Sequence, residues 1–443
     1  MGGGSIVDTD SSRSAPCGPG YDHAWGDATG LPVPSHPAAL IAAGPDFLTH
    51  AFRTFGWLGA DNRVTEIVRA EPCRIGSTGE KLFLSVAYAH PGLETELFAK
   101  FSRNFDDPVR DRRRAELAPE IALAALSRVA DLGIAVPQAV FADFEAASDT
   151  GLLITCEVPF GKGAVEPLHH KCMDHELDDP LEYYRAVVRA LARLAGAHKS
   201  GALDPFVDRL LPYDADTAAA EDPMPWSADE VRAHVARYAD FAARCPQLLP
   251  PAVREPDFLR RFEEEAVRVA ANTYAIKRYL QREPRLIALS HFNAQIDNGW
   301  FWRDADGALQ CGLLDWQRAR QMNLAYALWG ALSGMGPDRF MDNLDTMLAL
   351  FASELRAQGG PAIAVADLRE NMLLYAATIG LAGLIETPAT VLSRLPEAQT
   401  AADAFDPVFA QSEAARAFLH VFTNFLSLWE AGDLTRAIDR ICQ

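Results

Sequence analysis

Basic residues are in short supply in this chain of 443 residues. Lys and Arg together number 41 against 60 Asp and Glu, which gives a formal net charge of -19 and a pI near 5.0. Phosphate backbones and anionic lipid surfaces bind to basic patches, so this balance argues against nucleic acid or a membrane as the main partner. It places no limit on small-molecule substrates.

Cysteine motifs and long apolar segments are also missing. The cysteines are odd in number and scattered, with no CxxC pair, so neither a zinc site nor a disulfide framework is indicated. The N-terminus has no basic segment followed by an apolar one, and the apolar stretch Met372–Ile385 is too short and too interrupted by glycine to span a bilayer. We therefore expect reduced thiols and a soluble, cytoplasmic protein. The sequence does not indicate an oligomeric state.

The chain has enough apolar residues for a large core. Hydrophobic residues make up 49% of it and charged residues 23%, which at this length favours two lobes. Residues 1–60 are predicted to form an arm, loosely ordered to about Pro45, followed by a helix that begins near Asp46. A β-rich lobe is expected over 61–158, and a mostly helical lobe over 159–443, because Pro159 ends a strand and helical periodicity follows it.

The β-rich lobe contains a turn rich in glycine and hydroxyl groups. Gly76, Ser77, Thr78 and Gly79 separate the first two of three predicted antiparallel strands. Backbone N–H groups of such a turn can bind phosphate, but the same composition occurs in ordinary hairpins, and the residues alone leave both interpretations open. The third strand, TELFAKFS, carries Lys100 on the face opposite Phe101.

An inward-facing lysine on an apolar strand needs a partner. Glu116 and Glu120 lie one helical turn apart in the helix predicted over 115–132, and either could pair with Lys100. Pro119 is better tolerated in a first turn than in mid-helix, which favours Glu120. The alternative is that Lys100 is a solvent-facing lysine on an edge strand.

The most informative stretch runs from Leu286 to Gln317 and is predicted to form a hairpin that presents polar side chains. The loop before its first strand contributes His291, Asn293, Asp297 and Asn298, and the second strand ends on Asp315. Carboxylate and amide oxygens at this density suit a hard cation such as Mg2+ that is shared with a phosphate-bearing substrate.

These motifs resemble the aminoglycoside phosphotransferase family, which has the protein-kinase-like fold. Members carry a loop of the form HGDxxxxN followed by a strand ending in DWQ or DWE, and this chain has HFNAQIDN from His291 to Asn298 and DWQ from Asp315. The resemblance implies an α+β, bilobal fold, with a small N-terminal antiparallel sheet that carries one main helix and a larger, mostly helical C-terminal lobe. It also implies ATP or another nucleotide as cofactor, together with Mg2+, and a small-molecule substrate.

The resemblance implies roles for individual residues. Asn298 and Asp315 match the family's magnesium ligands, Lys100 its phosphate-binding lysine and Glu120 the glutamate that pairs with that lysine. The nucleotide-binding positions are matched by Gly76, Ser77, Thr78 and Gly79 in the turn and by Glu157 and Val158 in the segment that usually meets adenine.

Three departures from the family pattern bear on activity, and one of them is Phe292, which stands where the family has glycine. Asn293 stands where the family has its catalytic aspartate, and a neutral amide cannot take a proton from the attacking hydroxyl. His291 and Asp297 are the other candidate catalytic residues of the loop. Ala327 replaces an aspartate that supports the loop in relatives.

Two hypotheses follow from these residues. The chain is either a phosphotransferase with slowed transfer, or a catalytically silent kinase-fold protein that binds a nucleotide or metabolite as a regulatory module. A third use of the pocket, for group transfer without ATP or for a cyclisation, keeps the fold but has no specific sequence signal.

Overall fold

A computed structural model describes residues 21–74, 76 and 78–442 of the chain. They form two compact units. The first unit contains the described residues up to Val129 together with Pro137–Val158 and Trp316–Arg318, and the second contains Ala130–Val136, Pro159–Asp315 and Ala319 onwards.

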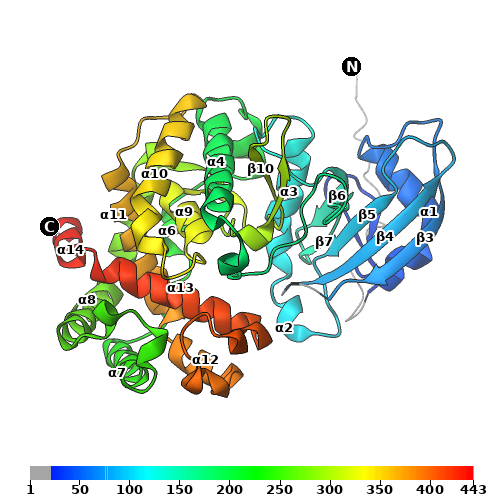
Figure 1. Ribbon diagram of the computed structural model, residues 1–443. Helices are drawn as coiled ribbons and strands as arrows, with labels where there is room; N and C mark the ends of the chain where they lie inside the picture. Colours follow the sequence, from blue (N-terminus) through cyan, green and yellow to red (C-terminus); the bar gives the residue numbers. More distant parts are fainter. Residues whose placement is uncertain (1–20, 75, 77, 443) are drawn as a thin grey trace. The chain divides into compact units, whose positions relative to one another are not determined.

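The first unit is built on a five-stranded sheet in which every pair of neighbours is antiparallel (Figure 1). The strand order is β3-β4-β5-β7-β6. The strands are β3 (Val64–Pro72), β4 (Glu80–Tyr88), β5 (Glu96–Phe101), β6 (Ala139–Glu145) and β7 (Thr150–Cys156). The three strands expected before Phe101 are therefore present, and they pair in sequence order.

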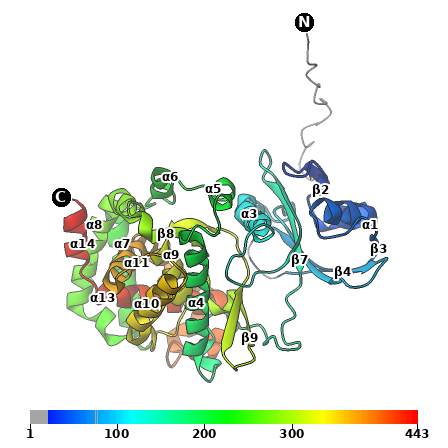
Figure 2. The same ribbon diagram turned by 90° about the horizontal axis from the view of Figure 1, so that it is seen from above.

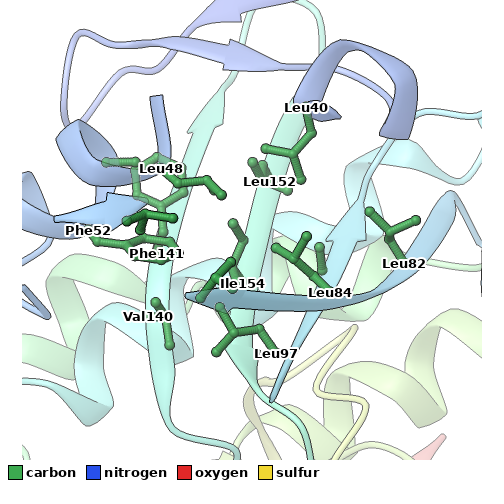
Figure 3. Packing of buried hydrophobic residues seen from close by; sticks show 14 of the residues in the cluster. Leu40, Leu48, Phe52, Leu82, Leu84, Leu97, Val140, Phe141, Leu152 and Ile154 are labelled. Atoms are coloured by element: carbon green, nitrogen blue, oxygen red, sulfur yellow. The ribbon is translucent and has the colours of Figure 1, made fainter. Parts of the chain in front are cut away.

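One face of this sheet packs on helix α1 (Pro37–Thr54). In β4, β5 and β7 alternate residues point to this face, and Figure 3 shows them around the apolar side of the helix. The cluster includes Leu40, Leu48, Phe52, Leu82, Leu84, Leu97, Val140, Phe141, Leu152 and Ile154. Burial of each large side chain contributes about 1.5–3 kcal/mol, so this layer fixes which face of β4 and β5 is left for other contacts.

The opposite face is covered by helix α3 (Ala118–Ser127), and Figure 2 shows α1 and α3 on opposite sides of the sheet. Ile121 and Ala124 of α3 pack on Ala142 and Leu153. The regular helix begins one residue before Pro119, after a short 3₁₀ turn, as expected from the preference of proline for a first turn.

The prediction of a loosely ordered arm up to Pro45 is wrong for the residues described from Tyr21 onwards. Strand β1 (His23–Trp25) pairs with β2 (Pro32–Pro34), and α1 starts before Pro45, which follows a kink at Gly44. The loop between β1 and β2 is held by Asp143 of β6, whose carboxylate accepts the N–H groups of Ala28 and Thr29 at 3.1 and 3.0 Å. This order comes from a contact more than a hundred residues away, which local composition cannot reveal.

The second unit is mostly helical, with two small two-stranded sheets (Figure 1). Its longer helices are α4 (Pro180–Lys199), α7 (Ala228–Arg244), α8 (Pro256–Gln281), α9 (Leu324–Leu332), α10 (Phe340–Ala357), α11 (Val365–Ile379) and α13 (Glu413–Glu430). The sheets pair β8 (Ile287–Ser290) with β11 (Arg320–Asn323), and β9 (Gly299–Arg303) with β10 (Leu309–Leu313). Fold class is confirmed: a small antiparallel sheet is followed by a larger helical part.

Two details of the second unit differ from expectation. Helical periodicity in the sequence predicts one helix over 414–441, but the structure has two, α13 and α14 (Leu434–Ile441), because Asp433 caps a new helix after Gly432. Strand β11 was not anticipated. Among the described residues no single helix is long and apolar enough to cross a membrane, although the bent pair Val365–Leu384 and Thr387–Arg394 meets those criteria when taken together.

Candidate functional site

The hairpin expected between Leu286 and Gln317 is present in the second unit as β9 and β10. Leu313 pairs with Gly299 at its open end, and one step further the N–H of Leu314 donates to the carbonyl of Asn298 at 2.9 Å. The ladder therefore places Asn298 beside the end of the strand that leads into Asp315.

Asn298 is held with its amide nitrogen committed to the protein. Its Nδ2 donates to the carbonyl oxygen of Asn293 at 2.8 Å, and the residue is 9% exposed. This hydrogen bond uses the nitrogen and not the oxygen, so Oδ1 keeps its capacity as a cation ligand.

Asp315 follows directly on the hairpin, in a backbone conformation that is uncommon for a residue with a side chain. Its φ is 62°. Left-handed conformations at non-glycine residues gather at functional sites, because only a specific set of surrounding contacts maintains them.

The oxygen donors of Asn298 and Asp315 fit magnesium. Mg2+ keeps several waters and takes only one or two protein oxygens alongside substrate phosphates, so this pair would be a sufficient protein contribution. Within the described ranges no group of three or more His, Cys, Asp or Glu side chains could hold a metal ion.

His291 fixes the start of the polar loop, defined as His291–Asn298. The side chain is buried, and its Nδ1 accepts the N–H of Asn293 while its Nε2 lies 3.0 Å from the carbonyl oxygen of Leu314. A ring nitrogen beside a carbonyl must donate, so the network assigns the neutral tautomer with the proton on Nε2. His291 thereby ties the loop to the end of β10 and positions both Asn293 and the strand that precedes Asp315.

Asp297 is engaged in an ion pair rather than being presented to solvent. Its Oδ2 lies 3.3 Å from the Nζ of Lys171, and both side chains are largely buried. Burial raises the pKa of the Asp297 carboxyl, in spite of the opposing attraction of the lysine.

The loop is also supported from the side of α9. Ala327 is fully buried there, and Gly330 approaches so closely that a Cβ on it would lie 1.9 Å from the carbonyl oxygen of Phe292. On the other side His198 of α4 accepts the N–H of Leu289 in β8 at 2.9 Å. The backbone of α9 thus packs closely on the polar loop, although Ala327 provides no carboxylate to support it.

In the first unit Lys100 and Glu120 form a buried ion pair. The Nζ of Lys100 lies 2.8 and 3.1 Å from the two carboxylate oxygens, and the side chains are 11% and 7% exposed. The prediction that α3 supplies the partner of Lys100 through Glu120, and not through Glu116, is confirmed. Glu116 pairs instead with Arg113.

In the glycine-rich turn between β3 and β4, φ is 88° at Gly76 and 47° at Gly79. A Cβ at Gly79 would lie 1.8 Å from the carbonyl oxygen of Phe101, so only glycine fits there. Thr78 is buried and its hydroxyl bonds to the side-chain amide of Gln317 at 2.8 and 2.6 Å. Ser77, the remaining predicted turn residue, lies outside the described residues.

Glu157 and Val158 stand at the end of the first unit. The Glu157 carboxylate accepts from Arg69 at 2.7 Å, and Arg69 also donates to Glu96 at 2.9 Å. The N–H of Glu157 donates to the carbonyl of Glu96 at 2.9 Å. The contact with adenine expected at these two residues stays a prediction.

Four residues near the predicted ones were not anticipated from the sequence: Lys81, Lys171, Gln317 and Gly330. Gln317 is part of the DWQ motif, so its position in the chain was a signal. Lys81 is the first basic residue after the glycine-rich turn, which was a second signal.

No family model matches the chain, and no curated relative matches its sequence. Among solved structures, the ethanolamine kinase of Plasmodium vivax is 10% identical, with 83% of each chain covered and a TM-score of 0.40. An aminoglycoside-3'-phosphotransferase of type VIII is 18% identical over 70% of this chain and 93% of its own, with a TM-score of 0.33. A microcompartment-associated aminopropanol kinase is 14% identical over 78% and 94%, with a TM-score of 0.38.

All three of these structures are named as kinases or phosphotransferases. Similarity at this level establishes no substrate or activity for the present chain.

Proposed function

We propose that this protein binds a magnesium–nucleotide complex, with ATP as the nucleotide, and transfers a phosphoryl group to a hydroxyl of a small molecule. The observation that carries the proposal is the buried pair of Lys100 and Glu120. Phosphoryl transfer needs a lysine on the phosphates and a carboxylate that orients it, and a sheet lysine fixed by a helix glutamate meets that need.

Asn298 and Asp315 would hold the magnesium ion, each through side-chain oxygen. When bound, the ion would neutralise charge on the phosphates. The hydrogen bond from Asn298 to Asn293 and the link from His291 to Leu314 keep the two ligands oriented before any nucleotide arrives.

In the reaction proposed, the acceptor oxygen attacks the γ-phosphorus while the bond from that phosphorus to the β,γ-bridging oxygen breaks. ADP leaves, and the acceptor hydroxyl loses its proton. Asn293 has no site for that proton, the ring nitrogens of His291 are both engaged, and Asp297 is paired with Lys171.

The proton therefore passes to a phosphate oxygen or to water. A positioned base typically contributes 10²–10⁴-fold, so transfer at a rate lower by about that factor is expected. Positioning and electrostatic stabilisation supply the rest, because the transition state of phosphoryl transfer is loose.

Calorimetry of ATP with and without Mg2+ tests the binding half of the proposal. Tight binding that requires Mg2+ and that is lost in Asn298→Ala is expected. ATP affinity that is the same without Mg2+ and in Asn298→Ala would contradict the assignment of the metal ligands. Turnover is then measured as ADP release with a panel of hydroxylated metabolites.

A silent binding module is the second candidate, and the engaged state of His291 and Asp297 beside Asn293 favours it. Asn293→Asp discriminates between the two. An inactive parent with an active variant establishes the silent module, whereas clear turnover by the parent establishes the enzyme.

A further inference from the structure

Two phenylalanines lie directly opposite each other on the neighbouring strands β4 and β5 of the first unit. The register that makes Lys81 and Lys100 Cα partners also pairs Phe83 with Phe98. Their ring centroids are 5.3 Å apart, and the ring planes are inclined by 60°. Side chains two residues apart on a strand point to the same face, so Phe98 lies on the face of Lys100, about 6.6 Å further along the strand.

The pair is partly exposed, although its neighbours in the chain are not. Phe83 and Phe98 are half-buried, whereas the residues on either side of them belong to the buried layer beneath α1: Leu82, Leu84, Leu97 and Ala99. Helix α3 packs on the β6 and β7 part of the other face, and neither phenylalanine belongs to that layer. Aromatic surface that both layers leave open indicates a place where a ligand completes the packing.

The polar groups beside the pair are bonded to one another. The guanidinium carbon of Arg69 lies 5.5 Å from the ring centroid of Phe83. Arg69 donates to the carboxylates of Glu96 and Glu157. The N–H of Glu157 donates to the carbonyl of Glu96, and the N–H of Cys156 also donates to a backbone carbonyl. Neither of these two N–H groups can therefore donate to the edge of a base.

We propose that Phe83 and Phe98 form a stacking platform for the base of the nucleotide, and that the platform selects nucleotides by the size of the base rather than by its edge. This inference rests on the proposed function, in which Lys100 meets the phosphates, and deepens it. The ribose and the α-phosphate separate the base from the terminal phosphates. The base would therefore lie further along the sheet than Lys100, which is where the pair is.

The chemistry of stacking sets the expected selectivity. Stacking on aromatic side chains tolerates every base, because each base has a π face. ATP and GTP are therefore bound with similar affinity. CTP is bound more weakly than either, because a pyrimidine offers a smaller ring surface.

Phe98→Leu tests the platform, because leucine keeps an apolar side chain and removes the ring. Loss of base stacking corresponds to about a 5- to 150-fold change in affinity for alanine substitutions. In calorimetry with Mg2+, the leucine variant should bind ATP and GTP at least about fivefold more weakly and ribose 5-triphosphate equally well, because this probe has no base. Phe83→Leu should behave in the same way. Phe98→Tyr keeps the ring and should keep the parent affinities.

Phe144→Leu is the matched control. Phe144 is a half-buried phenylalanine on β6 of the same sheet, and it packs on the layer beneath α3. Its replacement should leave the affinities for ATP, GTP and ribose 5-triphosphate unchanged. If Phe98→Leu weakens the binding of all three ligands by the same factor, the ring only supports the sheet and the inference is overturned.

The native protein separates failure of the inference from failure of the proposed function. If it binds neither ATP nor ribose 5-triphosphate, the proposed function fails and the inference fails with it. If it binds ATP no more tightly than ribose 5-triphosphate, only the inference fails.

The same comparison decides the matter should the leucine variants not fold. Similar affinities for ATP and GTP, both at least about fivefold tighter than for ribose 5-triphosphate, support the inference. Binding of ATP more than about tenfold tighter than GTP overturns it, because the edge of the base would then be read.

Discussion

Replacement of Lys100 by methionine separates a structural role of the Lys100–Glu120 pair from a role in nucleotide binding. The two side chains are 11% and 7% exposed, and the shorter contact is 2.8 Å. Removal of one partner of a buried ion pair costs about 3–5 kcal/mol. In a chain of 443 residues this corresponds to a fall in melting temperature of about 3–5 °C for Lys100→Met.

The double variant Lys100→Met with Glu120→Leu carries the decisive result. Apolar replacement of a whole buried ion pair is often neutral or stabilising, so most of the lost stability should return. Affinity for Mg-ATP should not return, because the ammonium that meets the phosphates is still missing. Melting curves and calorimetry on the parent, both single variants and the double variant complete the cycle.

Arg113 and Glu116 provide the control, since they form an exposed ion pair of similar length, 2.9 Å, in the same unit. Arg113→Met should change stability by less than about 1 kcal/mol and leave affinity unchanged. Recovery of both stability and Mg-ATP affinity in the double variant would refute a role for Lys100 beyond packing. A Lys100→Met variant that is as stable as the parent would refute the estimate of the cost of breaking the ion pair.

Three further predictions concern the polar loop, a buried histidine and the glycine-rich turn. Gly330→Ala should lower stability by about 1–3 kcal/mol and weaken Mg-dependent binding, because its Cβ would lie 1.9 Å from a carbonyl oxygen of the polar loop. The control Gly383→Ala has open space around it and should be neutral or stabilising, so equal melting curves for the two variants would contradict this prediction. Burial lowers the pKa of His420 to about 4, so the folded state binds fewer protons than the unfolded state between about pH 4 and 6.5. The free energy of unfolding should therefore fall by about 3 kcal/mol on acidification through that range, and its dependence on pH should be weaker in His420→Gln. Thr78→Val removes the bond to Gln317 and should cost about 1 kcal/mol with faster amide exchange in the turn; unchanged exchange would count against it.

The sequence was most informative where one local pattern carried the information. Period-two alternation placed Lys100 on the face away from Phe101, and the preference of proline for a first helical turn selected Glu120 as its partner. The hairpin that ends before Asp315 was recognisable from its turn residues and apolar strands. Each of these inferences needed only residues close together in the chain.

The parts that could not be predicted depend on register and on distant contacts. That Lys81 faces Lys100 follows from which residues of β4 and β5 pair, and no residue type in either strand determines that register. The ordering of the segment before α1 depends on Asp143, and the pairing of β8 depends on the polar strand β11. Polar strands and long-range caps leave no periodic signal.

Asn293 leaves the polar loop without the carboxylate found in the family that the motifs resemble, so other contacts hold the loop in place. His291 provides part of this support, because one ring bonds both the Asn293 backbone and the strand end at Leu314. Asn298 closes the loop from the other end through its own amide. These three contacts orient the proposed metal ligands without using a carboxylate at position 293, so the proposed metal site does not depend on an acidic residue there. Residue 293 and the proposed metal site can therefore be tested by separate substitutions, with Asn293→Asp acting on the rate of transfer and Asn298→Ala on the binding of Mg-ATP.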